Sequence, residues 1–342
     1  MILSNICLPG RVVNYHTLLA ICVIGLIYHL YALSGSTSLL VPIDAPAPAP
    51  SAPAPAPAAP AASSASAAPA APIQGNDRIP KQIWYKLGPR GLSDDMRAWT
   101  NTCIQGNPAY RVEFMTDDSS NAWVNKTFSA TRPDLVDAYL ALSVPIFKAD
   151  ILRYLLLWAE GGIWLDLDVS CNGIPMGAWI PAEYKAKANL VVGWEFDHGH
   201  EGSYFHQLAS WTIMSVARSP HMLQVIDDIF HDLKRVTAEQ QIPVQNLTVA
   251  HVDDVVDFTG PRRLTRGIFA SLAKSMNTRI EPLEVQEILQ PRLIGDVLVL
   301  PGRSFAASVN RYRPEEEQEL PPSLATHHYA GSWKNDRGGE AR

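Results

Sequence analysis

Apolar and polar positions form their most informative pattern between residues 143 and 169, where the sequence predicts a helix followed by a strand. Ser143 is expected to cap the helix with its hydroxyl group, and Pro145 falls in the first turn, where its missing N–H is harmless. Gly161 and Gly162 are expected to end the helix, because glycine adopts the left-handed conformation found there without strain. The helix is apolar on almost every side, so most of it should be buried.

Two charged side chains interrupt this apolar helix. Asp150 and Arg153 lie three residues apart and therefore share one face, while the residues around them are typical of a core. Burying a charge is costly unless the charge is paired or serves a ligand. Two interpretations follow: a mutual buried ion pair, or a pair of side chains that contact a bound molecule.

The strand that follows places two carboxylates on one face. Alternation predicts one side made of Trp164, Asp166 and Asp168, and a core-facing side made of Ile163, Leu165, Leu167 and Val169. Two hard oxygen ligands suit a divalent cation such as Mn²⁺ or Mg²⁺ that also holds a diphosphate. A D-x-D pair by itself also occurs at solvated strand ends and in turns, so the residues around it decide the interpretation.

Strands and helices alternate through the rest of the C-terminal part. Strands are predicted at 81–85, 110–115, 190–196 and 297–300, and helices at 94–105, 133–142 and 221–235. This alternation predicts a layered α/β domain with a mostly parallel central sheet. Ligands of such sheets gather at the carboxyl ends of the strands, which is where Asp166 and Asp168 fall.

The first 76 residues have the composition of a membrane anchor and a stalk. Residues 18–33 are an apolar run, interrupted by Gly25, Tyr28 and His29, that is long enough to cross most of a bilayer core of about 30 Å. A cleaved signal peptide and a buried core helix are the alternatives. An uncleaved anchor is favoured, because the A-x-A-like sites that follow lie in low-complexity sequence.

Charge predicts the membrane orientation of this N-terminal region, and composition predicts a stalk. Arg11 precedes the apolar run, and no Lys or Arg follows it until Arg78. The positive-inside rule therefore keeps residues 1–17 in the cytoplasm and sends the rest of the chain into a lumen. Residues 34–76 are rich in Ala, Pro and Ser and should form an extended stalk, which leaves residues 77–342 for a lumenal domain.

The remaining composition adds three constraints. A net charge of -6 and a pI near 5.9 argue against nucleic acid as a partner, since that partner needs a basic face. The glycosylation sequons at Asn125 and Asn246 fit a lumenal domain. Cys103 and Cys171 are the two cysteines of this domain, and an oxidising lumen would permit a bridge that braces the segment after Asp168; the sequence leaves this pairing open.

The chain resembles glycosyltransferase family 32, and more narrowly its fungal initiation-specific α-1,6-mannosyltransferases. The resemblance rests on three neighbouring motifs: A-D-x-x-R at 149–153, G-G-I-W at 161–164 and D-L-D at 166–168. Four further segments are similar to segments of that family, in the expected order: 79–84, 210–221, 257–265 and 327–333. The similarity extends over about residues 77 to 335, and it implies a single Rossmann-like nucleotide-sugar transferase domain of the GT-A type.

The resemblance also implies a metal site. Asp166 and Asp168 are expected to bind Mn²⁺ (or Mg²⁺) together with the donor diphosphate. A histidine of the C-terminal H-Y-x-G loop is expected to complete the site, and His328 is preferred over the adjacent His327. The alternative for either ring is that of an ordinary surface-loop histidine.

Donor-binding residues are implied in the same way. Asp150 and Arg153 are expected to face the donor sugar, with the mutual ion pair as the alternative. Trp164 shares the carboxylate face and is expected to contact the nucleotide, although large aromatic side chains are commonly core residues. Ser332 and Trp333 are expected to close over the diphosphate, or else to be packing residues.

The activity implied is the retaining transfer of mannose from GDP-mannose to a mannose hydroxyl of an N-glycan, in α-1,6 linkage. Same-face attack assisted by the leaving phosphate is the expected mechanism, since no carboxylate is identifiable as a nucleophile from the sequence. An inositolphosphoceramide mannosyltransferase or another family 32 hexosyltransferase is the nearest alternative. An inactive lectin-like scaffold is disfavoured because every expected site residue is present. The implied location is the Golgi membrane, as a single-pass type II protein and a partner in a Golgi mannosyltransferase complex.

Overall fold

The computed structural model describes residues 78–199, 206–280 and 284–340. The expected cytoplasmic tail, membrane anchor and stalk lie outside these ranges. Within them, no helix combines the length and the apolar character needed to cross a membrane.

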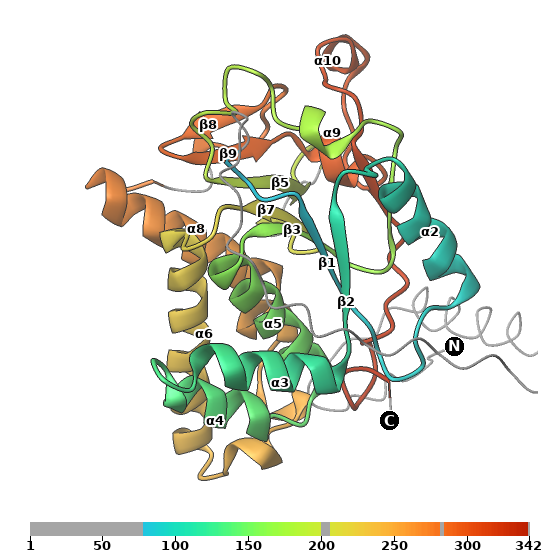
Figure 1. Cartoon of the computed structure of the whole chain (residues 1–342). Helices are drawn as coiled ribbons and strands as arrows, with labels where there is room; N and C mark the ends of the chain where they lie inside the picture. Colours follow the sequence, from blue (N-terminus) through green and yellow to red (C-terminus); the bar gives the residue numbers. More distant parts are fainter. Residues whose placement is uncertain (1–77, 200–205, 281–283, 341–342) are drawn as a thin grey trace, which may run out of the picture. The chain divides into compact units, whose positions relative to one another are not determined.

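A central sheet organises the described domain (Figure 1). Its strands are β1 (Gln82–Lys86), β2 (Arg111–Met115), β3 (Gly162–Leu165), β5 (Leu190–Phe196), β6 (Gln207–Leu208), β7 (Thr212–Ser215), β8 (Arg292–Ile294) and β9 (Val297–Leu300). Their order is β2-β1-β3-β7-β5-β9-β8, and β6 pairs with β5. A separate two-stranded ribbon joins β4 (Val169–Cys171) to β10 (Ala325–His327).

The sheet is mixed, so the predicted mostly parallel sheet is wrong in this respect, while the predicted α/β domain is confirmed. β1 runs parallel to β2 and β3, and β5 runs parallel to β9. β7 lies antiparallel between β3 and β5. Between β5 and β7 the chain forms β6, which already runs antiparallel to β5, and β7 keeps this returning direction.

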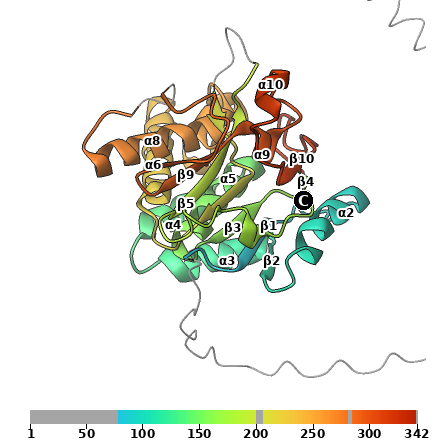
Figure 2. The same ribbon diagram turned by 90° about the horizontal axis from the view of Figure 1, so that it is seen from above.

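Helices cover both faces of the sheet, and Figure 2 shows the two helical layers from above. The helices are α2 (Asp94–Gln105), α3 (Asp117–Phe128), α4 (Pro133–Ala141), α5 (Pro145–Ala159), α6 (Pro220–Glu239), α7 (Val255–Phe258), α8 (Pro261–Met276), α9 (Gly302–Ala306) and α10 (Pro314–Glu317). One buried core lies between the sheet and α3, α4, α5, α6 and α8. A second core lies between the opposite face, α2, α9 and the β4–β10 ribbon.

The ends of α5 confirm two of the three local predictions made for it. Pro145 is its first residue, and the helix ends before Gly161 and Gly162, whose φ angles of 71° and 101° are left-handed. The predicted Ser143 cap is wrong: the residue at the cap position is Val144, and the Ser143 hydroxyl donates to the Gln245 carbonyl at 3.3 Å. A tertiary hydrogen bond has replaced the local one.

The predicted alternation of side chains along β3 is confirmed by where they are buried. Trp164 lies in the core beneath α5, and Ile163 and Leu165 lie in the core on the other face. β3 ends at Leu165, however, so the two carboxylates belong to the turn beyond the strand. The turn leads into β4, whose Cys171 forms a disulfide with Cys103 of α2. The pairing left open by the sequence is therefore present.

Candidate active site

A cavity of about 1000 Å³ lies where β1, β3 and β5 end. Its walls come from the first turns of α3 and α5, the turn after β3, the segment around β6, the start of α8 and residues 327–340. Seven predicted site residues line it: Asp150, Arg153, Trp164, Asp166, Asp168, Ser332 and Trp333. The position agrees with the expectation that ligands gather at the carboxyl ends of strands.

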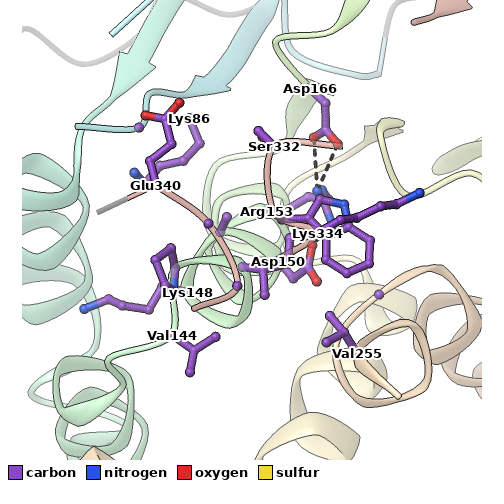
Figure 3. Close-up of a pocket in the computed structure, with 18 of the residues that line it drawn as sticks. Lys86, Val144, Lys148, Asp150, Arg153, Asp166, Val255, Ser332, Lys334 and Glu340 are labelled. Atoms are coloured by element: carbon purple, nitrogen blue, oxygen red, sulfur yellow. Dashed lines mark hydrogen bonds and ion pairs between the residues drawn. The ribbon is translucent and has the colours of Figure 1, made fainter. Parts of the chain in front are cut away.

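Arg153 links the helix to the turn that carries the carboxylates. Its Nη1 donates to Asp150 Oδ1 at 2.6 Å and its Nη2 donates to Asp166 Oδ1 at 3.0 Å; Figure 3 shows the second contact as dashed lines. The other Asp150 oxygen accepts a hydrogen bond of 2.7 Å from the Thr259 hydroxyl. The indole N–H of Trp164 donates to Asp166 at 2.6 Å. These contacts fix the orientation of both carboxylates relative to the guanidinium.

The two carboxylates beside the buried Arg153 keep its guanidinium charged against the effect of burial. Asp150 and Arg153 are each 3% exposed, so the ion pair considered from the sequence does form, and both residues also border the cavity. Burial alone would lower the pKa of Arg153, but the carboxylates of Asp166 and Asp150 raise it above its ordinary value. The guanidinium therefore remains charged at the cavity wall.

Asp166, Asp168 and His327 form a group suited to a metal ion. One ligand atom from each of the three side chains lies within 4.8 Å of the others. His327 is the last residue of β10 and pairs with Val169 of β4, which brings its Nε2 to 3.3 Å from Asp168 Oδ1. The Ala330 N–H donates to the second oxygen of Asp168 at 3.0 Å.

The pKa of Asp168 reflects these contacts. Burial would raise it, but the hydrogen bond and charge of His327, together with the Ala330 N–H, bring it below the usual value. The carboxylate is therefore held in its anionic form, which is the form that binds a cation.

His328, the histidine preferred from the sequence, lies outside this group. Its ring stacks on Trp99 with 4.1 Å between centroids, and its Nε2 lies 2.8 Å from the Ser170 hydroxyl. β10 ends at His327, so His328 lies beyond the strand, and its ring contacts Trp99 and Ser170 instead of joining the metal group. The geometry favours His327 as the ligand and assigns His328 a packing contact.

The three remaining predicted site residues differ in their exposure to the cavity; they are Trp164, Ser332 and Trp333. Trp164 is 1% exposed and its N–H is already used by Asp166, so its clearest contribution is to orient that carboxylate. Ser332 and Trp333 belong to the C-terminal segment that lines the cavity, next to Lys334, as Figure 3 shows for Ser332 and Lys334. Their expected contact with a diphosphate stays a prediction.

Three features of the site and of the residues that support it were not predicted from the sequence. Thr259 fixes Asp150, and His327 replaces His328. The third is Glu195, a buried carboxylate near the end of β5 that lines the cavity and whose pKa is raised by burial. A lone acid within an apolar strand that ends at the same sheet edge as β3 was the available signal.

Positive charge also lines the cavity. Lys86, Lys148 and Lys334 border it (Figure 3). Lys86 pairs with Asp117 at 2.8 Å, and Lys148 donates to Asn121 at 2.8 Å. A concave wall with several cations raises the local concentration of an anionic ligand such as a diphosphate.

Residues 93–185 match a family model described as the glycosyltransferase sugar-binding region containing the DXD motif. The matched stretch contains Asp150, Arg153, Asp166 and Asp168. The predicted similarity to glycosyltransferases with a DXD motif is confirmed for this stretch of the chain.

Several relatives of this chain are named as mannosyltransferases. The chain is 29% identical over 277 residues to the initiation-specific alpha-1,6-mannosyltransferase of Schizosaccharomyces pombe, an alignment that covers 75% of this chain and 64% of that protein. It is 29% identical over 295 residues to the corresponding protein of Candida albicans, covering 78% of this chain and 74% of the other. It is 35% identical over 94 residues to inositol phosphoceramide mannosyltransferase 3 of S. pombe, covering 28% and 25%. The predicted resemblance to family 32 and its α-1,6-mannosyltransferases is therefore confirmed.

Proposed function

We propose that this glycosyltransferase transfers mannose from GDP-mannose to a mannose hydroxyl of an N-glycan, in α-1,6 linkage and with retention of configuration. The observation that carries the proposal is the grouping of Asp166, Asp168 and His327 beside the Asp150–Arg153 pair in one cavity. The names of the two relatives that align over most of the chain support mannose as the sugar.

The residues at the carboxylate turn fit a divalent cation. Two carboxylates and one imidazole supply hard oxygen ligands and a borderline nitrogen ligand, a set that suits Mn²⁺ and is compatible with Mg²⁺. Asp166, Asp168 and His327 would hold the ion, which when bound supplies positive charge to the leaving diphosphate.

The chain's own residues orient the donor. Arg153, fixed between two carboxylates, presents a permanent positive charge to the sugar or the diphosphate. Asp150 accepts hydrogen bonds from sugar hydroxyls. Lys86 and Lys148 attract the diphosphate, and Ser332 with Trp333 covers it and excludes water.

Transfer then proceeds on one face of the sugar. The acceptor oxygen forms its bond to the anomeric carbon as the bond from that carbon to the diphosphate oxygen breaks. The acceptor's proton passes to the leaving diphosphate, so no separate base is required. Charge that builds up on the leaving group is stabilised by the fixed positive charge of Arg153.

The proposed location is the Golgi membrane, with a single N-terminal anchor, a stalk and a lumenal catalytic domain that works within a mannosyltransferase complex. The Cys103–Cys171 disulfide supports a lumenal domain, because disulfides persist in oxidising compartments.

A second candidate differs in the acceptor. The 35% identity to inositol phosphoceramide mannosyltransferase 3 over 94 residues favours a glycolipid acceptor with the same donor. The two candidates share the cavity and its charges, so the acceptor must be decided by assay.

The deciding experiment uses the purified full-length chain. Transfer is measured from a panel of nucleotide sugars, with Mn²⁺ and with chelator, to a core N-glycan and to inositol phosphoceramide. The expected result is Mn²⁺-dependent transfer from GDP-mannose to the N-glycan. An Asp168→Asn variant should lose this transfer, while an Asp137→Asn variant, altered at an exposed helix position, should keep it. Transfer from another nucleotide sugar alone, or full activity in chelator, would overturn the proposal.

A further inference from the structure

Glu195 is a cavity carboxylate that neither the metal group nor the Asp150–Arg153 pair uses. It is the residue before the last in β5 and is 6% exposed. Gln207 of the neighbouring strand β6 donates its amide to Glu195 Oε2 at 2.9 Å. A carboxylate buried to this extent at a cavity wall costs stability, which a purely structural role would not require.

Two buried donors border Glu195 without a hydrogen bond of ordinary geometry. The Trp211 indole N–H and the Tyr329 hydroxyl find no hydrogen-bond partner among the described residues. Both approach Glu195 as hydrogen-bond donors and lower its pKa, although burial, which raises it, has the larger effect, and neither donor forms a hydrogen bond of ordinary geometry. Buried polar groups are nearly always hydrogen-bonded, so this arrangement indicates that a ligand supplies the missing partners.

These groups are continuous with the proposed metal site. The Trp211 ring stacks on His327 with 4.6 Å between centroids, and the Tyr329 ring meets His327 edge-on at 4.1 Å. A molecule bound to Glu195, Trp211 and Tyr329 would therefore lie beside the place where the glycosidic bond forms.

The chemistry of the three groups selects the ligand. A carboxylate repels a phosphate but accepts hydrogen bonds from hydroxyls, and an indole N–H and a phenol can donate to the oxygens of the same hydroxyls. Neighbouring hydroxyls of a sugar offer both functions. The lysines at β1 and α5 make that part of the cavity suited to the diphosphate, which leaves the β5 part for a neutral sugar.

We propose that Glu195, Trp211 and Tyr329 form a subsite that binds the hydroxyls of the acceptor sugar and positions the attacking hydroxyl beside the metal group. This inference rests on the proposed function. Glu195 accepts a hydrogen bond from an acceptor hydroxyl, while Trp211 and Tyr329 donate to acceptor oxygens. Gln207 holds the carboxylate in place.

The test measures KM for each substrate separately in the full-length enzyme. Glu195→Gln keeps the shape of the side chain but removes its charge, so KM for the core N-glycan should rise about 10- to 100-fold, the range expected for loss of a hydrogen bond to a charged group. KM for GDP-mannose should stay within about twofold, since the donor is bound elsewhere. The matched control, Glu183→Gln at an exposed position, should leave both values unchanged.

Tyr329→Phe provides a second, independent readout. It should raise the acceptor KM about two- to tenfold, as for loss of a neutral hydrogen bond. It should also leave the melting temperature of the ligand-free protein unchanged or higher, because the hydroxyl removed makes no hydrogen bond of ordinary geometry there. If Glu195→Gln fails to fold, the acceptor KM of Tyr329→Phe decides whether the subsite exists.

An acceptor KM that stays at the wild-type value in the folded variants would overturn the subsite, and so would a donor KM that rises in step with it. Failure of the proposed function looks different: the wild-type enzyme would then transfer no mannose from GDP-mannose to the glycan at any acceptor concentration.

Discussion

Replacing Arg153 separates a structural role of the buried charges from a role in donor binding. Arg153→Gln removes the positive charge but leaves Asp150 buried, with the Thr259 hydroxyl and an amide as partners. Removing one partner of a buried ion pair typically costs about 3–5 kcal/mol, because the remaining charge is uncompensated. The Asp166 side chain is 29% exposed, so its lost contact should add at most about 1 kcal/mol.

The predicted loss is large enough to measure by thermal unfolding. At about 2–4 °C per kcal/mol for a domain of this size, Arg153→Gln should lower the melting temperature by roughly 6–24 °C. Adding Asp150→Asn removes the uncompensated charge, so the double variant should recover most of the loss. If both residues also bind the donor, the recovered protein should remain inactive and should bind GDP-mannose at least about tenfold more weakly.

Two results would refute this reasoning. Unchanged melting of the single variant would mean that Asp150 is not confined as its 3% exposure indicates. A stable and fully active double variant would mean that the pair serves the fold alone and that the donor sugar binds elsewhere.

Further predictions concern the metal group, the disulfide and a second buried acid. His327→Ala should raise the Mn²⁺ concentration for half-maximal activity at least about tenfold, whereas His328→Ala should change it less than about twofold; equal shifts would contradict the assignment. Replacing Cys103 and Cys171 by Ala opens a loop with a sequence separation of 68 and should lower the free energy of unfolding by about 4 kcal/mol in denaturant titrations, and a loss below about 1 kcal/mol would argue against it. Burial raises the pKa of Asp197 from 3.8 to about 7, so the folded state binds this proton more tightly than the unfolded state and stability should fall as pH rises between these values. Asp197→Asn should remove that fall, a gain of roughly 4 kcal/mol at pH 8, and an unchanged pH slope of melting would refute it.

Local sequence was sufficient to predict α5, β3 and the turn that carries Asp166 and Asp168. Pro145, Gly161 and Gly162 mark the ends of the helix through backbone preferences that act within a few residues. Alternation placed Trp164 on the opposite face from Ile163 for the same reason.

Long-range pairing could not be predicted in the same way. The direction of β7 depends on its two neighbours in the sheet, and its short apolar stretch gives no sign of direction. The choice between His327 and His328 depends on the register of β10 on β4, and a shift of one residue would exchange the two rings. Glu195 was missed because its role depends on Trp211 and Tyr329, which approach it only in the folded chain.

The pairing of β10 with β4 has a consequence for the biosynthesis of the enzyme. Asp168 accepts a hydrogen bond from Ala330, which lies 162 positions later in the chain. His327, which completes the metal group, lies in the same late segment. The carboxylates are thus synthesised long before their partner. A growing chain can form α5, β3 and both acids, yet it acquires the full ligand set only after residues 325–330 have been added. Completion of the site therefore follows completion of the fold, so a nascent chain cannot assemble this ligand set early.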